Sequence, residues 1–464
     1  EFRRVLFRSI NMMDRMEKEH INITSFMLLR HGKVLCEASY EPYDAAQLRT
    51  VYSLSKTFTS MAVGIAAGEG KIDLDEKITD LFAAEIENGK IHVGKELASL
   101  SLRHLLRMST GQEKEPGDSD CWDDMVSAFL REPFHEMPGE VFRYNSIATY
   151  MLSASLKKKG IDLEHYLEEK LLTPMGISGT RWLRDPKGIC VGGFGFSLYP
   201  EVIAKLGQMI LQGGVWNGVQ LVPKDYIDMA TSKQIENGND PDSDWAQGYG
   251  YQMWRCRHNA VRGDGMYGQF CIIHKETDTV LAMTAVTSDM QGEMNAYYDE
   301  VLLKYQDEPL SEDEKTMEVL KKRLNELHYV RPLPEDDGSA VPDAFKKINL
   351  SLTSFFDLSL NIEGNMLTLT GKDGEIWYRA ERGCWSKISR KVHCSPFYTE
   401  KDSMDTPVIG AWGVKNGALT IRVYEIEFLE EDTLTLTEAE DGIHVSFANT
   451  TIPSNPNEYV KKVI

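Results

Sequence analysis

The sequence predicts an α+β domain over residues 10–308, a helix and linker over 309–337, and an all-β barrel or sandwich over 338–464. Strand patterns lie near both ends of the first domain and helical patterns fill its middle. We therefore expect one antiparallel sheet that takes strands from both ends. After the linker the pattern changes to short strands and turns. A chain of 464 residues is also too long for a single hydrophobic core.

The first domain opens with a helix and a hairpin. Residues 10–19 carry methionines at helical spacing, and residues 25–30 and 34–38 are typical of two strands joined by a tight glycine turn. The first nine residues contain three arginines but no apolar core leading to a cleavage site, which is not typical of a signal peptide. We leave these nine residues out of the fold prediction and expect a cytoplasmic protein.

A second, buried helix is predicted to follow Ser53. Ser53 and Lys56 are three residues apart, so a helix places both side chains on one face, one turn apart. The segment that follows is apolar nearly all round and ends at Gly68. Burial and a helix N-terminus both favour a neutral amine, which can take the proton of a serine nucleophile. The S-x-x-K spacing alone also fits an N-cap followed by a solvated lysine.

The remaining elements follow from apolar periodicity and from Gly and Pro breaks. Helices are predicted over 100–108, 125–130, 147–159, 161–171, 199–212, 292–305 and 314–327. Strands of the first domain are predicted over 249–254, 268–274 and 280–286. A proline-containing linker covers 332–337, and strand patterns of the tail include 361–369, 418–424 and 433–437.

Bulk properties exclude several function classes. The net charge of −20 argues against binding to nucleic acid or to an anionic membrane. No apolar run reaches the roughly 18 residues of a membrane span. The seven cysteines include no C-x-x-C pair, which favours a reducing compartment over a disulfide framework, and the eleven histidines show no metal-ligand spacing. We therefore expect neither a metal nor a cofactor.

Beyond the S-x-x-K motif, five segments occur in a characteristic order: Ser53–Ser60, Glu69–Asp75, His104–Gly111, Pro138–Ser146 and Leu172–Ile177. Five ordered segments are far more specific than the S-x-x-K motif alone. In these segments the chain resembles the serine β-lactamase and penicillin-binding-protein-like hydrolases, in particular the class C-like branch with its carboxylesterases and D-aminopeptidases. The resemblance covers roughly the first 300 residues.

The resemblance implies a β-lactamase/transpeptidase-like fold and assigns three catalytic roles. Ser53 is the acylated nucleophile, Lys56 is its proton partner, and Tyr144 is the general base. The family's second motif, Tyr-x-Asn, is altered here, because Asn145 comes one place early and Ser146 stands where the amide should be. This departure weakens the expected contact between Asn145 and the substrate.

The family's third motif, Lys or His, then Thr or Ser, then Gly, is also altered. The best match is the segment 263–268, in which Gly263 replaces the cation and Asp264 replaces the hydroxyl. Its strand, with Asp264 and Gly265 at the cleft, can still supply the backbone N–H of Met266 to an oxyanion hole shared with Ser53. Because neighbouring side chains on a strand face opposite ways, Arg262 is not counted as the missing cation.

These observations predict a serine hydrolase that forms an acyl-enzyme on a small-molecule ester or amide. The exchange of a hydroxyl for Asp264 favours neutral or amine-bearing substrates over anionic β-lactams. One alternative is a β-lactamase or DD-peptidase, which the altered third motif opposes. A second is a catalytically silent binding module, which the intact Ser53, Lys56 and Tyr144 set opposes. The sequence does not predict the oligomeric state or the role of the tail domain.

Overall fold

A computed structural model describes residues 2–116, 119–305, 314–328, 333–353, 356–371, 374, 376–392, 404–449 and 459–463. The chain divides into two compact units, residues 1–329 and 330–464. The predicted linker residue Pro332 and the predicted boundary at 308–309 lie outside the described residues.

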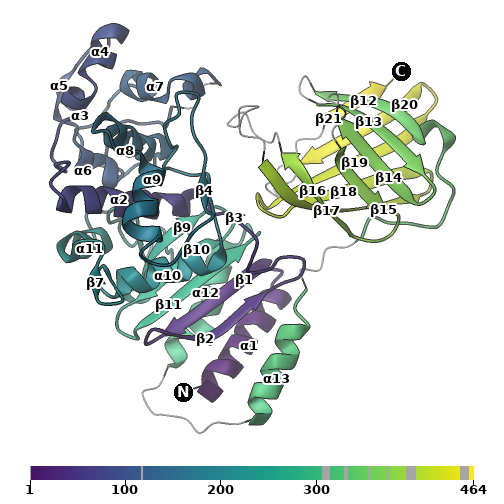
Figure 1. Ribbon diagram of the computed structural model, residues 1–464, viewed down its shortest axis with the longest axis horizontal. Coiled ribbons are helices and arrows are strands. Elements are labelled where there is room, and N and C mark those ends of the chain that lie inside the picture. Colours follow the sequence, from purple (N-terminus) through teal and green to yellow (C-terminus); the bar gives the residue numbers. More distant parts are fainter. Residues whose placement is uncertain are drawn as a thin grey trace. The chain divides into compact units, whose positions relative to one another are not determined.

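The first unit is built around one antiparallel six-stranded sheet in the order β2-β1-β11-β10-β9-β8 (Figure 1). Its strands come from both ends of the unit, as the sequence predicts. The bounds are Ile23–Arg30 (β1), Lys33–Ser39 (β2), Trp254–Arg255 (β8), Val261–Gly265 (β9), Gln269–His274 (β10) and Thr279–Ala285 (β11). Two small sheets add β3 (Arg49–Thr50), β4 (Arg181–Trp182) and β5 (Phe196–Leu198), and β6 (Val215–Trp216) with β7 (Val219–Gln220).

Strand alternation gives the sheet two apolar faces. Phe270 and Ile272 of β10 join the core formed with α1 and α12, whereas Cys271 and Ile273 join the core formed with α2, α8 and α10. A strand with both faces covered is apolar along its whole length, which explains why β10 and β11 stand out in the sequence. The sheet therefore separates two helical layers.

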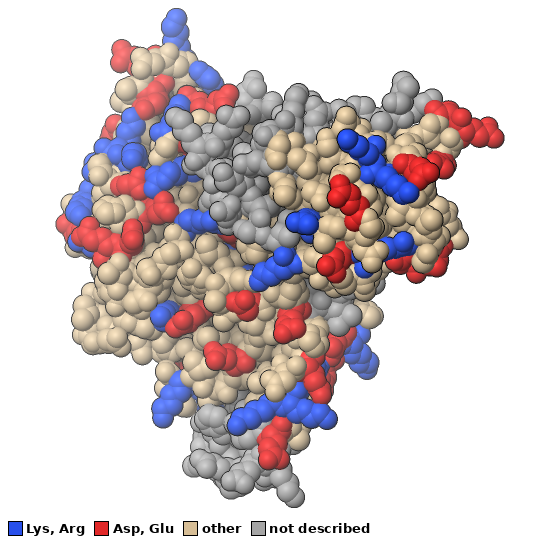
Figure 2. All heavy atoms as spheres, turned by 45° about the vertical axis from the view of Figure 1, so that its right-hand side comes forward, with Lys and Arg blue, Asp and Glu red and all other residues tan. Residues whose placement is uncertain are grey.

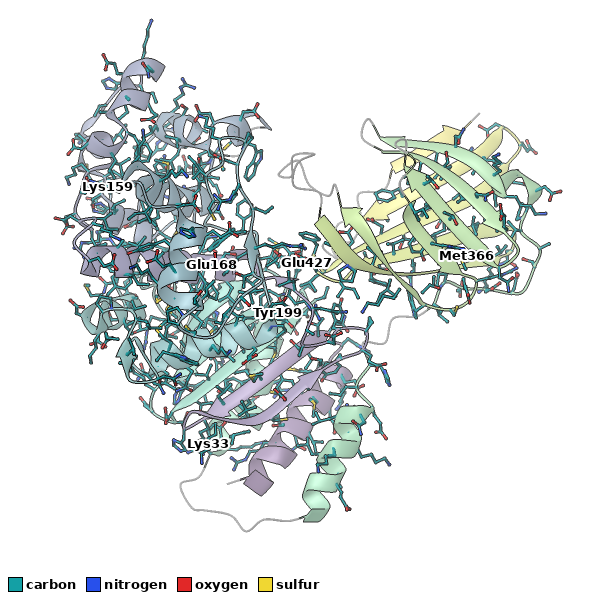
Figure 3. All side chains as sticks on the ribbon, viewed as in Figure 1. Lys33, Lys159, Glu168, Tyr199, Met366 and Glu427 are labelled. Carbon is teal, nitrogen blue, oxygen red and sulfur yellow. The ribbon has the colours of Figure 1, made fainter. Side chains whose placement is uncertain are left out.

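The helices of the first unit follow the predicted order. Their bounds are Phe2–Lys18 (α1), Ser55–Gly68 (α2), Ile78–Leu81 (α3), Ala83–Gly89 (α4), Lys95–Ser99 (α5), Leu102–Leu106 (α6), Met125–Arg131 (α7), Ser146–Lys158 (α8), Leu163–Leu167 (α9), Pro200–Leu211 (α10), Lys224–Thr231 (α11), Met290–Glu300 (α12) and Glu314–Asn325 (α13). Figure 3 labels Lys33, at the start of β2, and Lys159, at the end of α8, which mark the sheet half and the helical half of the unit.

Both ends of the first unit differ from the prediction. Helix α1 begins at Phe2 rather than at residue 10, and Arg8 and Ser9 are buried. Residues 2–9, which the fold prediction left out, are therefore part of this helix. Helix α13, predicted as the helix of the segment 309–337 between the two domains, packs beside α1 (Figure 1), where Arg323 forms an ion pair with Asp14 at 2.9 Å. The physical reason is the apolar face of α13, whose Leu320 is 4% exposed against the α1 and α12 core.

The predicted strand over 249–254 is wrong for most of its length. Regular pairing is limited to Trp254–Arg255, and Gln252 has a left-handed backbone with φ of +60°. A β-strand cannot continue through such a residue. The aromatic residues of this segment are buried: Tyr249 packs against Phe142 and Trp254, and Tyr251 packs against Tyr226 of α11.

The second unit is all-β, as predicted. Strands β12–β15 form a four-stranded sheet and β16–β21 a six-stranded sheet. The two sheets meet at β15 and β16 and again at β12 and β21, which gives a barrel-like closure around an apolar interior. The bounds are Lys347–Thr353 (β12), Phe356–Glu363 (β13), Met366–Gly371 (β14), Ile376–Glu381 (β15), Ser386–Val392 (β16), Met404–Lys415 (β17), Ala418–Glu425 (β18), Glu430–Ala439 (β19), Gly442–Asn449 (β20) and Tyr459–Val463 (β21).

Charged side chains are interspersed on the face drawn in Figure 2, where the coloured residues show no broad basic patch. Of the helices that the structure describes, none has the length and apolar character needed to cross a membrane. All the cysteines whose surroundings are described are free thiols; Cys394 lies outside the described residues.

Candidate active site

Ser53 lies at the junction of the two halves of the first unit. It is the middle residue of a 3₁₀ turn, Tyr52–Leu54, that runs directly into α2. Helix α2 is buried from Ser55 to Ala66, as predicted from its apolar sequence. Tyr52 has a φ of +47°, a strained value for a bulky residue. Strain of this kind is found where surrounding structure holds a functional residue in place.

Lys56 is buried beside Ser53 with three hydrogen-bond partners. Its Nζ lies 3.0 Å from Ser53 Oγ, 3.2 Å from Ser146 Oγ and 2.7 Å from the carbonyl oxygen of Gly193. The lysine is 1% exposed. The amine is therefore held in one place by two hydroxyls and one carbonyl, drawn from three separate segments of the chain.

Burial changes the proton affinity of this lysine. It lowers the pKa of Lys56 from an ordinary 10.5 to about 7, although the nearby carboxylates of Glu115 and Asp264 oppose the shift. A substantial fraction of the amine is thus neutral at neutral pH. A neutral amine within hydrogen-bond distance of a serine hydroxyl can accept its proton.

Tyr144 also borders the site, but in its neutral form. Burial raises the pKa of the Tyr144 phenol well above its ordinary value, although a hydrogen bond with Ser53 opposes the shift. Lys56 Nζ lies 4.9 Å from the centre of the Tyr144 ring, and the Trp254 ring stacks on the Tyr144 ring with 5.5 Å between the ring centres. The direction of this shift disfavours the tyrosinate that a general base at Tyr144 requires.

The altered Tyr-x-Asn motif has a clear structural outcome. Ser146, not Asn145, faces Lys56. The side-chain oxygen of Asn145 caps helix α8 by accepting from the Ala148 N–H at 2.9 Å, and its amide nitrogen donates to Gln112 at 3.3 Å. Asn145 is 2% exposed. Its amide is occupied within the fold, so we remove it from the candidate substrate contacts.

The end of β9 lies against the segment that precedes Ser53. A Cβ at Gly265 would lie 2.2 Å from the Val51 carbonyl oxygen, so this close approach requires glycine. The turn that follows holds Met266, which is 50% exposed, and Tyr267, whose ring meets the edge of Tyr52 at 5.2 Å. The structure thus brings the turn that carries Met266 and the turn that carries Ser53 together.

Gly263 cannot be replaced by the family's cation without moving α2. A Cβ at Gly263 would lie 2.3 Å from Leu54 Cδ1 and 2.7 Å from Thr57 Oγ1. Both atoms belong to the packed core around the Ser53 turn. The missing cation is therefore a consequence of how closely β9 approaches α2.

We expect Gly263→Ala to lower the free energy of unfolding by about 1–3 kcal/mol, the usual range for overpacking a core. Urea unfolding measures the difference. Gly94→Ala serves as the control, because its Cβ would meet only the end of the Glu96 side chain at 3.1 Å. Equal stability of the Gly263→Ala and Gly94→Ala variants would contradict the close packing of β9 on α2.

Arg262 and Asp264 form a buried ion pair on the other face of β9. Arg262 Nη2 lies 2.7 Å from Asp264 Oδ2, with side-chain exposures of 0% and 9%. The Arg262 guanidinium also lies 4.4 Å from the Trp245 ring. Burial raises the pKa of Asp264, whereas Arg262 opposes that shift. Asp264 is therefore paired with Arg262 rather than free in the cleft, and Arg262, fully buried in this pair, is not an exposed cation.

Sequence reasoning missed Gly193, which accepts the shortest hydrogen bond of Lys56. A Cβ at Gly193 would lie 2.6 Å from the Ser146 carbonyl oxygen, so only glycine fits between α8 and the lysine. Two adjacent glycines before a helix were the available signal. In the described part of the chain, no group of His, Cys, Asp or Glu side chains is arranged to hold a metal ion.

This fold is that of the β-lactamase/transpeptidase-like proteins: an antiparallel sheet between helical layers, with a serine–lysine pair at the start of the central helix. The chain belongs to the beta-lactamase family, whose model matches residues 11–304. The matched region contains Ser53, Lys56, Tyr144 and Met266.

The relative and the solved structures that follow are similar to this chain at low identity. Protein flp of Staphylococcus aureus (strain MW2) is 22% identical over 181 residues, which cover 36% of this chain and 36% of that protein. The match thus spans about a third of this relative's length. A putative 6-aminohexanoate-dimer hydrolase from Bacillus anthracis has a TM-score of 0.54 and 19% identity, covering 64% of this chain and 83% of that one.

Two further structures share the fold. EstCE1, described as a hydrolase with promiscuous acyltransferase activity, has a TM-score of 0.52 at 13% identity and covers 62% of this chain and 98% of its own. The octameric penicillin-binding protein homologue from Pyrococcus abyssi has a TM-score of 0.52 at 15% identity, covering 92% of this chain and 97% of that one. At these identities the likeness concerns the fold alone.

Proposed function

We propose that the chain is a serine hydrolase of the S-x-x-K type that acts on ester or amide substrates through an acyl-enzyme at Ser53. One observation carries the proposal. The Nζ of Lys56, whose pKa is lowered to about 7 by burial, lies 3.0 Å from Ser53 Oγ. A nucleophile needs a base that is unprotonated at working pH and within hydrogen-bond reach, and this pair meets both conditions.

The reaction begins with neutral Lys56. Ser53 Oγ attacks the carbonyl carbon while its proton moves to Lys56 Nζ. The two remaining N–H bonds of the amine point to the Gly193 carbonyl oxygen and the Ser146 hydroxyl, so every polar group of the base has a partner. The backbone N–H groups of Ser53 and Met266 are proposed to bind the oxyanion, because the two turns that carry them are in contact.

Collapse of the tetrahedral intermediate releases the alcohol or amine, which takes the proton of the Lys56 ammonium, directly or relayed through the Tyr144 hydroxyl, so that Lys56 is neutral again. Water then attacks the carbonyl carbon of the acyl-enzyme while Lys56 Nζ takes its proton. Collapse of the second intermediate breaks the bond between the carbonyl carbon and Ser53 Oγ, which takes that proton back from Lys56 as the acid leaves. In this scheme Tyr144 is a hydrogen-bond donor to Ser53 and to the leaving group. The raised pKa of its phenol supports a donor rather than a base.

The proposed substrates are neutral or amine-bearing esters and amides. Gly263 leaves no side chain where the family has a cation, and Arg262 is 0% exposed and paired with Asp264. The carboxylates that act on Lys56 are those of Glu115 and Asp264. A substrate carboxylate therefore meets no exposed cation from Gly263 or Arg262 and lies in the field of Glu115, which disfavours anionic β-lactams.

Turnover of p-nitrophenyl acetate and butyrate, compared with nitrocefin, tests this proposal, with Ser53→Ala as the blank. Ester hydrolysis that is lost in Ser53→Ala, with nitrocefin turned over at least tenfold less efficiently, is the expected result. Comparable nitrocefin turnover would instead support a β-lactamase or DD-peptidase. No turnover of any substrate would support a binding module of the same fold.

We expect the rate of Ser53 acylation to rise with pH and level off above about 7, because the pKa of Lys56 is lowered to about 7 and the neutral amine is the reactive form. Single-turnover kinetics from pH 5 to 9, a range chosen around this pKa, measure the rate. An acylation rate that falls as pH rises through 7 would contradict the prediction.

The same pKa shift makes stability depend on pH. Between a pKa of about 7 in the folded chain and an ordinary 10.5 in the unfolded chain, the unfolded chain binds more protons at Lys56. The contribution of Lys56 to the free energy of unfolding therefore rises with pH over this interval.

Ser146→Ala should lower the acylation rate about tenfold, because the lysine loses one hydrogen-bond partner while keeping Gly193. The comparison variant is Ser155→Ala on the same helix, whose hydroxyl bonds the Met151 carbonyl at 2.6 Å and does not contact Lys56. Stopped-flow acylation by p-nitrophenyl acetate measures both. Equal rates for the two variants would exclude a role for the Ser146 hydroxyl.

A further inference from the structure

Gln252 occupies an unusual place next to the proposed catalytic pair. It is 2% exposed, lies in the loop that enters β8, and has a φ of +60°. Its side-chain Nε2 donates to the carbonyl oxygens of Leu105 and Leu106, both at 2.9 Å, and its backbone N–H donates to Leu106 at 3.0 Å. A left-handed, non-glycine residue persists only where its surroundings fix it. Here the end of helix α6 does so.

The two remaining oxygens of Gln252 connect to the helices that carry the site. Its side-chain Oε1 accepts a hydrogen bond from Thr149 Oγ1 at 2.7 Å, and its carbonyl oxygen accepts one from Thr57 Oγ1 at 3.1 Å. Thr57 follows Lys56 on α2, and Thr149 lies one helical turn after Ser146 on α8. One buried residue therefore ties together α2, α6 and α8.

We propose that Gln252 is a positioning residue that sets the spacing between α2 and α8, and through it the contacts of Lys56 with Ser53 and Ser146. The proposal rests on the proposed function, because its consequence is the reactivity of Ser53. Without the amide, the Leu105 and Leu106 carbonyls and the Thr149 hydroxyl lose a buried partner. Relaxation of the two helices then admits water to Lys56, and weaker desolvation moves its pKa upward.

The test uses Gln252→Met, which keeps the length of the side chain and removes its hydrogen bonds. Gln208→Met, a change of the same type at a buried glutamine of α10, is the matched control. The rate of Ser53 labelling by a fluorophosphonate is measured against pH for each protein, with thermal unfolding as the check of folding. We expect Ser53 to be labelled about tenfold more slowly in Gln252→Met, because the buried hydrogen bonds of the Gln252 side chain are lost. Its pH midpoint should lie above the wild-type value, whereas Gln208→Met should keep the wild-type rate and midpoint.

Thr149→Val removes only one of these hydrogen bonds and keeps the test valid if Gln252→Met fails to fold. Slower labelling with a raised midpoint is expected, and Thr149→Val combined with Gln252→Met should be no slower than Gln252→Met alone, because both remove the same bond. Folded Gln252→Met or Thr149→Val with wild-type rate and midpoint overturns the positioning role, as does an equal loss in Gln208→Met. Absence of labelling in the wild-type protein instead rejects the proposed function itself.

Discussion

Ser53→Ala is expected to abolish ester hydrolysis, with kcat lowered by about 10⁴-fold or more, the scale on which removal of a serine nucleophile acts in other hydrolases. The physical reason is that the other hydroxyl beside Lys56, that of Ser146 at 3.2 Å, lies on α8 and not on the turn whose backbone N–H is proposed to bind the oxyanion. Ser55 lies two positions on, but its Oγ bonds the Tyr52 carbonyl at 2.5 Å, and it is fully buried. Steady-state hydrolysis of p-nitrophenyl butyrate measures the effect.

Ser55→Ala is the matched control for this change. It removes a hydroxyl from the same turn and leaves the pair of Ser53 and Lys56 in place. We expect Ser55→Ala to lose stability rather than chemistry, because the hydroxyl also accepts the backbone N–H of Phe196 at 3.2 Å. Residual activity in Ser53→Ala above one part in a hundred, with a fold intact by circular dichroism, would contradict the assignment of the nucleophile.

Lys56→Met is expected to lower kcat by about 10³-fold, the middle of the range for a general base. Methionine fills the buried volume but cannot accept the Ser53 proton. Lys56→Arg should be equally inactive, because a guanidinium stays protonated at any working pH. That second variant separates the need for a neutral base from the need for a positive charge.

Lys205→Met on α10 is the control for the lysine change, since Lys205 forms a surface ion pair with Glu201 at 3.0 Å. We expect it to keep wild-type kcat. Recovery of activity in Lys56→Arg would show that charge, not proton transfer, is what the site requires, and would reject Lys56 as the base. Stopped-flow measurement of the acylation step is needed, because a slow deacylation step can hide a slower acylation.

The sequence was sufficient for the elements that depend on local patterns. The apolar helix after Ser53, the hairpin at the start of the sheet, and the strands β10 and β11 all have strong local periodicity, and each was confirmed. The change to short strands after the linker likewise predicted the all-β second unit. These features need no information about which distant segments meet.

The contacts that complete the site depend on tertiary packing and could not be predicted. Which of Asn145 and Ser146 faces the lysine is decided by helix capping, since Asn145 is used as the N-cap of α8. Gly193 and Gln252 reach the site from loops far along the chain, and neither belongs to a local motif. The direction of the pKa shift at Tyr144 follows from desolvation of its partly buried phenol by segments that are distant in the sequence.

The central claim is that Ser53 is a nucleophile activated by neutral Lys56. Its most direct test is reaction of the protein with a fluorophosphonate, followed by peptide mass spectrometry that locates the adduct. We predict one adduct, on Ser53, formed faster as the pH rises through about 7, where the amine loses its proton. An adduct on another residue, or labelling of Ser53 at a rate unaffected by Lys56→Met, would contradict the claim.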